Sequence, residues 1–390
     1  MKAGVTITRV IVGLLFIFSG LVKANDPLGL SYKMQEFFEV WGLHGFNSWT
    51  LPMSVLMNAF EIIAGFALLI GWRIKLFSLL LLLLIIFFTF LTGYTYITGM
   101  PKNCGCFGDC LPISSLTSFS KDVALIFLIG FLIWKQKYIK PIFSRKTGFF
   151  AMLLITMFSF SFQWYCLTYL PVIDCLPFKK GNSISEKMKI PAGARPDSFA
   201  IRFIYTKEGK EYEFSPTELP ADLSTYTFVS RKDKLIKKGN AEPAIKGFDL
   251  KGVSGADSTK VVLEQPYAVL IFNENFLIPV SKWEKGFTKI YADAKAKNIP
   301  VYMITGQPGE VRAKLSGTSF AGLQTFTCDN TTIRTAARTN PCLYILKEGI
   351  IEGKWSYHHF GKAGKIIAGL VALPASPPEL PAAATDSINQ

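Results

Sequence analysis

Charged residues are scarce in the first 170 of the 390 residues, and their scarcity excludes an ordinary soluble domain for that part of the chain. Up to Leu170 the sequence is a series of apolar runs, and half of all residues in the chain are hydrophobic. From Pro171 onward, charged residues, glycine and proline recur at globular frequency. The composition therefore predicts a membrane part followed by a separate water-soluble part.

Histidine is also rare, because the chain has only His44, His358 and His359, and none has the spacing of a metal-ligand set. We assign these residues no role. The net charge of +14 would suit a nucleic-acid partner, but many basic residues lie at the ends of apolar runs, where membrane orientation and lipid headgroups explain them. We therefore expect no nucleic-acid partner. The basic run from Arg231 to Lys238 is interpreted as a solvated surface or a lipid-facing patch.

Five apolar segments have about the length that a membrane span requires, which is roughly 20 helical residues for a bilayer core about 30 Å thick. The first begins like a signal peptide, but its apolar stretch is long and four more spans follow it. We therefore interpret it as a retained anchor. The expected spans are Val5 to Ala24, Leu51 to Trp72, Leu76 to Ile97, Phe119 to Trp134 and Phe149 to Leu170.

The lysine and arginine residues near the spans gather at one set of span ends, which predicts a cytoplasmic N-terminus. We expect a multi-pass protein of the bacterial inner membrane, with the lipid bilayer as its first partner. The loops Asn25 to Thr50 and Thr98 to Ser118, and everything after Leu170, would then lie on the periplasmic side. The basic ends hold Lys2, Arg73, Lys75, Lys135, Lys137, Lys140, Arg145 and Lys146, and the alternate ends hold Lys23, Lys33, Lys102 and Lys121.

The water-soluble part is predicted to contain a small β-rich module and then an α/β domain. Alternating apolar and polar residues predict the strands Ile201 to Tyr205, Tyr212 to Phe214 and Thr225 to Ser230. A βαβ unit follows, and it implies a parallel sheet that is buried on both faces. Its elements are the strand Tyr267 to Phe272, a helix from about Val280 to Lys297 and the strand Val301 to Thr305.

The order of the remaining elements, a helix near Thr331 to Ala337 and the strands Cys342 to Leu346 and Ile350 to Trp355, resembles a thioredoxin-like domain. In that fold a redox pair would follow the first central strand, yet Asn273-Glu274-Asn275-Phe276 contains no cysteine. The resemblance also predicts a cis peptide before Pro341. The expected domains are a four-helix membrane bundle at 1–140, a fifth membrane helix at 141–175, the β-rich module at 176–242, the thioredoxin-like domain at 243–373 and a disordered tail at 374–390.

Three cysteines, Cys104, Cys106 and Cys110, fall within seven residues just before the fourth span, separated by glycines that allow tight bends. They are the candidate catalytic residues. They could exchange a disulfide, form a structural disulfide or bind a soft metal, and we favour exchange. An outer location favours disulfides, and the loop lacks the fourth ligand of tetrahedral zinc, so we expect no metal. A Cys-x-Cys ring is strained, so we expect Cys110 to bridge to Cys104 or Cys106.

The most specific combination along the first 140 residues joins charged, glycine and cysteine positions. It consists of Arg9, Gly13, Phe16, Ser19-Gly20, Lys23, Asp26-Pro27, Glu61, Gly65, Leu68-Leu69-Ile70-Gly71 and Cys104-Gly105-Cys106-Phe107-Gly108. With this combination the chain resembles the DoxX-like superfamily and its branch related to the methylamine-utilisation protein MauE. The resemblance implies a four-helix membrane bundle. It also implies thiol or quinone redox work at the outer membrane face, which makes a quinone the candidate cofactor.

Ionisable residues inside apolar spans are costly, so each one suggests a role. Arg9 and Glu61 could form an ion pair or a proton-handling site. Alternatively, Arg9 reaches the inner headgroups and Glu61 fixes helix packing through a hydrogen bond. Lys23 is a further candidate inside the first span. Asp122, at the start of the fourth span, could accept a proton from a thiol, or could simply be the acidic residue expected in a first helical turn.

Four further cysteines are candidates for structural disulfides. Cys166 and Cys175 flank the outer end of the fifth span, and could close a short bridge or lie beside the loop cysteines. Cys328 and Cys342 fall at the end of one expected strand and the start of another, as a bridge or as two unpaired buried thiols. With seven cysteines, at least one stays free or pairs with a partner.

Two functions fit these features. In the first, the loop cysteines exchange electrons between a quinone in the bundle and an exported thiol protein, and so support the maturation of exported proteins. In the second, the chain is a non-catalytic scaffold of a membrane complex, whose thioredoxin-like domain docks a partner protein while the loop disulfide only fastens the bundle. The missing dithiol of the water-soluble domain favours the scaffold, and the cysteine loop favours the redox protein.

Overall fold

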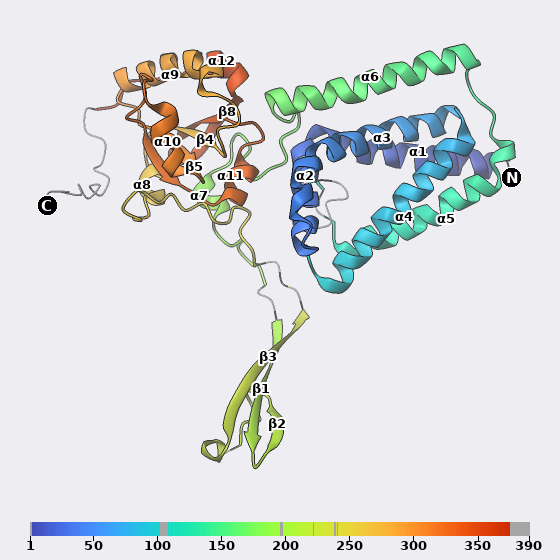
Figure 1. The fold of residues 1–390 in the computed structure, drawn as a ribbon, viewed down its shortest axis with the longest axis horizontal. Helices are drawn as coiled ribbons and strands as arrows, with labels where there is room; N and C mark the ends of the chain where they lie inside the picture. The colour runs from blue at the N-terminus through green and yellow to red at the C-terminus, as the bar shows by residue number, and fades with distance from the viewer. Residues whose placement is uncertain are drawn as a thin grey trace.

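Five long apolar helices make up the first part of the protein (Figure 1), and each is long and apolar enough to cross a membrane. The computed structural model describes residues 2–101, 108, 110–111, 113–195, 198–220, 222–237, 239 and 241–374. The helices confirm the five predicted spans, so the chain is a multi-pass membrane protein. Their bounds are α1 (Lys2–Asn25), α3 (Thr50–Ile70), α4 (Ile74–Thr98), α5 (Ser115–Trp134) and α6 (Arg145–Tyr169).

The helices α1 and α3 approach each other very closely at two glycines. A Cβ atom added at Gly13 would lie 3.0 Å from the carbonyl oxygen of Gly65, and one added at Gly65 would lie 2.8 Å from the carbonyl oxygen of Gly13. The two backbones therefore pack directly against each other, as small residues allow between membrane helices. α4 and α5 pack together beside this pair, and α6 lies along α3 (Figure 1).

The segment Asn25 to Thr50, which we predicted as a loop, contains the helix α2 (Pro27–Val40). Its start is well specified, because the Asp26 side chain accepts a hydrogen bond from the N–H of Gly29 at 3.1 Å and Pro27 occupies the first turn. α2 runs across the end of the bundle, whereas α1 and α3 run along it (Figure 1). The α/β domain lies at the same end of the bundle as α2, and we refer to this end as the domain end.

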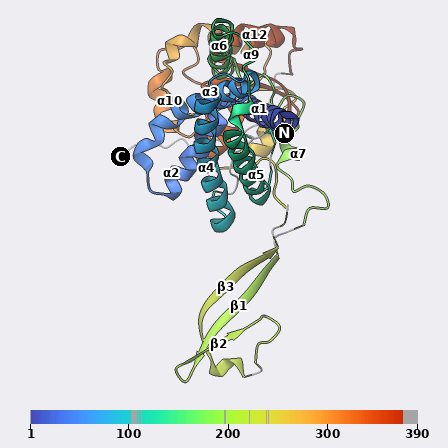
Figure 2. The same cartoon turned by 90° about the vertical axis from the view of Figure 1, so that its right-hand side faces the viewer.

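Three antiparallel strands form the β-rich module, in the order β2-β1-β3. Tyr205 of β1 pairs with Tyr212 of β2 on one side and with Phe228 of β3 on the other. The three predicted strands are confirmed, although each is longer than predicted and the third begins two residues later. The module projects away from both the bundle and the α/β domain in two perpendicular views (Figures 1 and 2). The bounds are β1 (Ser198–Lys207), β2 (Lys210–Phe214) and β3 (Thr227–Lys237).

A five-stranded sheet forms the centre of the α/β domain, in the order β6-β5-β4-β7-β8. β4, β5 and β6 are parallel, whereas β7 and β8 pair antiparallel. Every residue of β4 and β5 is buried, because apolar clusters cover both faces of the sheet. The predicted βαβ unit is thus confirmed. The bounds are α7 (Ile184–Lys187), α8 (Thr259–Leu263), β4 (Ala268–Asn273), α9 (Glu284–Ala296), β5 (Val301–Thr305), α10 (Pro308–Leu315), β6 (Gln324–Thr327), α11 (Asn330–Ala336), β7 (Cys342–Lys347), β8 (Ile350–Ser356) and α12 (Phe360–Gly369).

Candidate functional site

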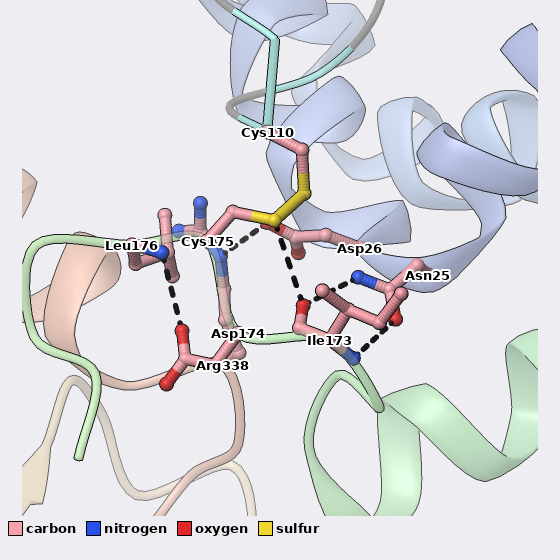
Figure 3. Close-up of a disulfide and its surroundings, with 8 residues drawn as sticks. All are labelled: Asn25, Asp26, Cys110, Ile173, Asp174, Cys175, Leu176 and Arg338. Atoms are coloured by element: carbon pink, nitrogen blue, oxygen red, sulfur yellow. Dashed lines mark hydrogen bonds and ion pairs between the residues drawn. A yellow bond between two sulfur atoms is a disulfide. The ribbon is translucent and has the colours of Figure 1, made fainter.

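A disulfide joins Cys110 to Cys175 at the domain end (Figure 3). Cys110 lies shortly before α5, and Cys175 lies in the segment between α6 and α7. The bridge that we predicted from Cys110 to a neighbour in its own loop is therefore wrong. Of the two alternatives for Cys175, a bridge to Cys166 is wrong and a position beside the loop cysteines is confirmed. The other two loop cysteines, Cys104 and Cys106, lie outside the described residues.

Asn25, the last residue of α1, explains why Cys175 meets Cys110. Its side chain donates a hydrogen bond to the carbonyl oxygen of Ile173 at 2.8 Å and accepts one from the N–H of Ile173 at 3.0 Å (Figure 3). These two bonds hold the segment after α6 against the end of α1. Cys110 lies beside the same end of α1, so the two cysteines meet there. The spacing of the cysteines could not show this, because the two lie 65 residues apart.

The disulfide lies in a half-buried position where sulfur exchange is feasible. Cys110 and Cys175 are both partly exposed. A cavity of about 10 Å³ adjoins them, and Asp26 and Asp174 also line it. Exchange requires a thiolate to reach one of the two sulfurs, and a fully buried bridge would prevent this. The geometry therefore suits exchange with a thiol that arrives at the domain end.

Two arginines fasten the α/β domain to α2. Arg338 donates a hydrogen bond from Nε to Oδ2 of Asp26 at 2.8 Å, and both side chains are largely buried. Arg334 donates one to Oε1 of Gln35 at 3.3 Å. The two guanidinium groups lie 5.3 and 5.4 Å from the ring centroid of Tyr32. Burial raises the pKa of Tyr32 to about 12, so its hydroxyl stays neutral between the two cations. No motif in the sequence indicates this contact surface.

A second contact joins the α/β domain to the end of α6. Ser356 donates a hydrogen bond from its hydroxyl to the carbonyl oxygen of Thr168 at 2.6 Å. The ring of Tyr169 stacks on His359, with 4.6 Å between the ring centroids. Burial in this contact, followed by the charge of Lys362, lowers the pKa of His359. The domain is therefore held at two separate places on the bundle.

The edge where a thioredoxin-like fold would carry its redox pair faces α2. Asn340 accepts a hydrogen bond from the N–H of Glu274 at 3.1 Å and donates one to the carbonyl oxygen of Asn275 at 2.7 Å. Arg334, which contacts α2, also pairs with Glu274 at 2.7 Å. The peptide before Pro341 is cis, as predicted. Through Arg334, α2 of the same chain thus contacts part of the surface that we expected to dock a partner protein.

Three cysteines in the described residues are unpaired and buried, namely Cys166, Cys328 and Cys342. The bridge that we considered between Cys328 and Cys342 is therefore wrong, and the alternative of two buried thiols holds. Burial raises the pKa of both thiols to about 12. Because the thiolate is the nucleophile, these two residues are unsuited to exchange at neutral pH.

Glu61 pairs with Lys23 and not with Arg9. Lys23 donates a hydrogen bond from Nζ to Oε1 of Glu61, and the exposed fractions of the two side chains are 2% and 0%. The ammonium group of Lys23 also lies 4.8 Å from the ring centroid of Phe88. Arg9 lies almost four turns before Lys23 on α1, roughly 21 Å away along the helix axis. The Arg9–Glu61 pair that we considered is therefore wrong. Glu61 joins α1 to α3 through an ion pair.

Asp122 lies beyond the first turn of α5, because the helix begins at Ser115 and is capped by Ser114. Its interpretation as an ordinary first-turn acid is therefore wrong. Asp122 is fully buried, pairs with Lys121 at 2.6 Å and accepts a hydrogen bond from the hydroxyl of Thr92 at 3.1 Å. A second charge pair thus lies on α5, with a buried carboxylate that is also hydrogen-bonded to α4.

An apolar groove of about 60 Å³ lies beside Lys23, between α2, α3 and α4. Its walls are almost entirely aromatic and aliphatic, and its charged groups are Lys23 and Lys33. Such a groove fits a flat or chain-like apolar molecule whose polar oxygen accepts a hydrogen bond from an ammonium group. The wall residues are Leu30, Met34, Phe37, Phe38, Trp41, Met53, Met57, Phe87, Phe88 and Leu91.

Comparisons with known proteins agree with this architecture. Residues 1–135 match the family model described as methylamine utilisation protein MauE. The matched residues include the helices α1 to α5, so this part of the chain is similar to MauE. Residues 199–238, which cover the β-rich module, match a model described as a domain of unknown function, DUF8463.

The chain also resembles one curated protein over part of its length. It is 26% identical over 153 residues to Protein TlpB of Flavobacterium psychrophilum, a match that covers 38% of this chain and 40% of that protein. The chain therefore spans less than half of the relative that it matches. No solved structure matches the chain. The wider DoxX and thioredoxin-like assignments accordingly stay predictions.

Proposed function

We propose that this MauE-related protein is a thiol–disulfide oxidoreductase of the bacterial inner membrane that supports the maturation of exported thiol proteins. The observation that carries the proposal is the half-buried Cys110–Cys175 disulfide at the domain end. It lies where the membrane bundle meets the water-soluble domain, so an exported chain can approach it. The lysine and arginine bias supports an outer, oxidising location for this end.

The exchange needs only the two sulfurs of the bridge. A substrate thiolate attacks one sulfur and forms a mixed disulfide, while the other cysteine leaves as a thiolate. A second substrate thiolate then attacks the substrate sulfur of the mixed disulfide, which forms the substrate disulfide and releases the protein cysteine. The substrate loses two electrons and two protons, and Cys110 and Cys175 gain them. Cys104 and Cys106 stay proposed catalytic residues, because they lie close to Cys110 along the chain.

We also propose a quinone as the final electron acceptor, held in the apolar groove. Lys23 would donate a hydrogen bond to a ring oxygen, while Phe37, Trp41 and Phe88 would pack against the ring and tail. A bound quinone supplies the acceptor for the two electrons and two protons that leave the reduced bridge. The near absence of polar groups in the groove, apart from two lysines, supports this class of ligand.

The α/β domain is proposed to be thioredoxin-like without being an electron carrier. Its strand order and its cis peptide before Pro341 support the fold, and the lack of cysteine in Asn273-Glu274-Asn275-Phe276 removes the chemistry. A non-catalytic assembly subunit is the second candidate function. The observation that favours it is the β-rich module, which projects away from the rest of the protein and offers a free surface to a partner (Figure 1).

Cysteine substitution separates the two candidates. We expect Cys110→Ser or Cys175→Ser to abolish oxidation of an added thiol peptide in nanodiscs, because neither variant can form the bridge that accepts the two electrons. Cys166→Ser is the matched control, because this thiol is buried and unpaired. Cys104→Ser and Cys106→Ser would show whether these residues take part. Unchanged peptide oxidation in the Cys110 and Cys175 variants, with only a less stable protein, would support the assembly subunit instead.

A further inference from the structure

A small cavity with charged and apolar lining residues lies inside the bundle and, like the apolar groove, adjoins Lys23. Its volume is about 20 Å³, which is enough for one water molecule. Lys23, Glu61, Ser19 and Lys121 contribute its polar lining, and apolar residues of α1, α4 and α5 complete it. Lys23 therefore lines both the groove and the cavity.

Glu61 provides the strongest sign that this cavity is hydrated. Its side chain is fully buried, and one of its oxygens, Oε1, accepts from Lys23. The second oxygen, Oε2, has no hydrogen-bond partner among the described residues. A buried carboxylate oxygen without a partner costs free energy, and a water molecule in the adjoining cavity would remove that cost.

The opposite wall of the cavity leads toward the domain end. Lys121 lines the cavity, pairs with Asp122 at 2.6 Å and keeps 24% of its side chain exposed. It lies two turns into α5 from the end that adjoins Cys110, roughly 10 Å along the axis. One cavity thus connects the Lys23–Glu61 pair, which adjoins the groove, with a partly exposed lysine on α5.

We infer that Lys23, Glu61, one cavity water and the Lys121–Asp122 pair form a proton path between the domain end and the apolar groove. The inference rests on the proposed function, in which reoxidation of the Cys110 and Cys175 thiols releases two protons at the domain end and reduction of the quinone takes up two protons at the groove. Electrons alone cannot complete the reaction, because two thiols plus one quinone give one disulfide plus one quinol. Glu61 is a positioning and proton-handling residue here, since the described contacts place Lys23 between it and the groove.

The path can be tested without any ligand, through the exchange of the Lys23 ammonium protons with water. The protein carrying ¹⁵N-lysine in nanodiscs is followed by NMR, and Lys23→Arg assigns the resonance. We expect rapid exchange in the parent protein and at least tenfold slower exchange in Lys121→Met. Lys121→Arg, which keeps the charge beside Asp122, should restore it. Lys260→Met is the control, because this exposed lysine lies on α8. Slow exchange in the parent, or no effect of Lys121→Met, would overturn the path.

A functional measurement separates this inference from the proposed function. In a single-turnover experiment, a thiol peptide should reduce the Cys110–Cys175 disulfide of the Glu61→Gln variant as fast as it reduces that of the parent protein. In steady state with a short-chain quinone, Glu61→Gln should turn over about a hundredfold more slowly, a loss typical of a positioned proton donor. Absence of disulfide reduction in the parent would contradict the proposed function. Equal steady-state rates with Glu61 and Gln would contradict the proton path alone.

Discussion

At the scale of single residues, burial divides the cysteines into reactive and silent groups. Cys328 and Cys342 are buried in the α/β domain, and burial raises both pKa values to about 12 from an ordinary value of 9. Their thiolate fraction at pH 7.5 is therefore far below that of a free cysteine. We expect neither residue to be labelled by a maleimide in the folded protein, whereas both are labelled after denaturation. Mass spectrometry of the labelled peptides checks this, and labelling of the native protein at the rate of a free thiol would contradict it.

The residue scale is also where the sequence was least informative. Glu61 was recognised as a costly intramembrane charge, but its partner depends on which turn of α1 faces it, and a linear sequence does not show that Lys23 rather than Arg9 lies at its level. The sequence allows Cys175 either a bridge to Cys166 or a place beside the loop cysteines, and the choice depends on the Asn25–Ile173 contact. Neither contact has a local signal, because each joins segments that only tertiary packing brings together.

At the scale of elements, the approach of α1 to α3 depends on two glycines and gives a direct test. A Cβ atom at Gly65 would meet the carbonyl oxygen of Gly13 at 2.8 Å and the backbone nitrogen of Ile17 at 3.0 Å. Backbone atoms cannot rotate away, so we expect Gly65→Ala to destabilise the bundle by about 1–3 kcal/mol. The measurement is the fraction of protein that stays soluble in detergent after heating.

Gly130 on α5 is the matched control for this substitution. A Cβ atom there would meet no atom within 4 Å. Gly130→Ala should leave unchanged, or raise, the midpoint temperature at which half of the protein is no longer soluble after heating. The reason is that alanine is favoured over glycine in a helix by up to about 1 kcal/mol. Equal midpoints for Gly65→Ala and the parent would show that α1 and α3 can separate without loss of stability.

The long elements were the most predictable part of the fold. The five spans and the strand β5 follow directly from apolar runs, because burial in lipid or in a parallel sheet demands them. α2 was missed, although Asp26 and Pro27 form a recognisable helix start, because its sequence Pro27–Val40 lacks the long apolar run of a span. Its position against Arg334 and Arg338 could not be predicted, since that surface exists only once the α/β domain has folded.

At the scale of the whole molecule, the function depends on which side of the membrane the domain end faces. An epitope inserted after Val253, a residue that is 94% exposed in the α/β domain, reports this end. An epitope after Lys137, between α5 and α6, reports the opposite end. Because α5 and α6 are membrane helices, the two epitopes lie on opposite sides of the bilayer.

The lysine and arginine bias of the loops predicts which epitope is accessible in spheroplasts, which lack the outer membrane but keep the inner membrane closed. An antibody should bind the epitope after Val253 without permeabilisation, and should bind the epitope after Lys137 only after the inner membrane is opened. The reverse pattern would place the Cys110–Cys175 disulfide in a reducing compartment, where glutathione and thioredoxin keep thiols reduced. The bridge could then not act as an oxidant of exported thiols, whereas the ion pairs inside the bundle would be unaffected.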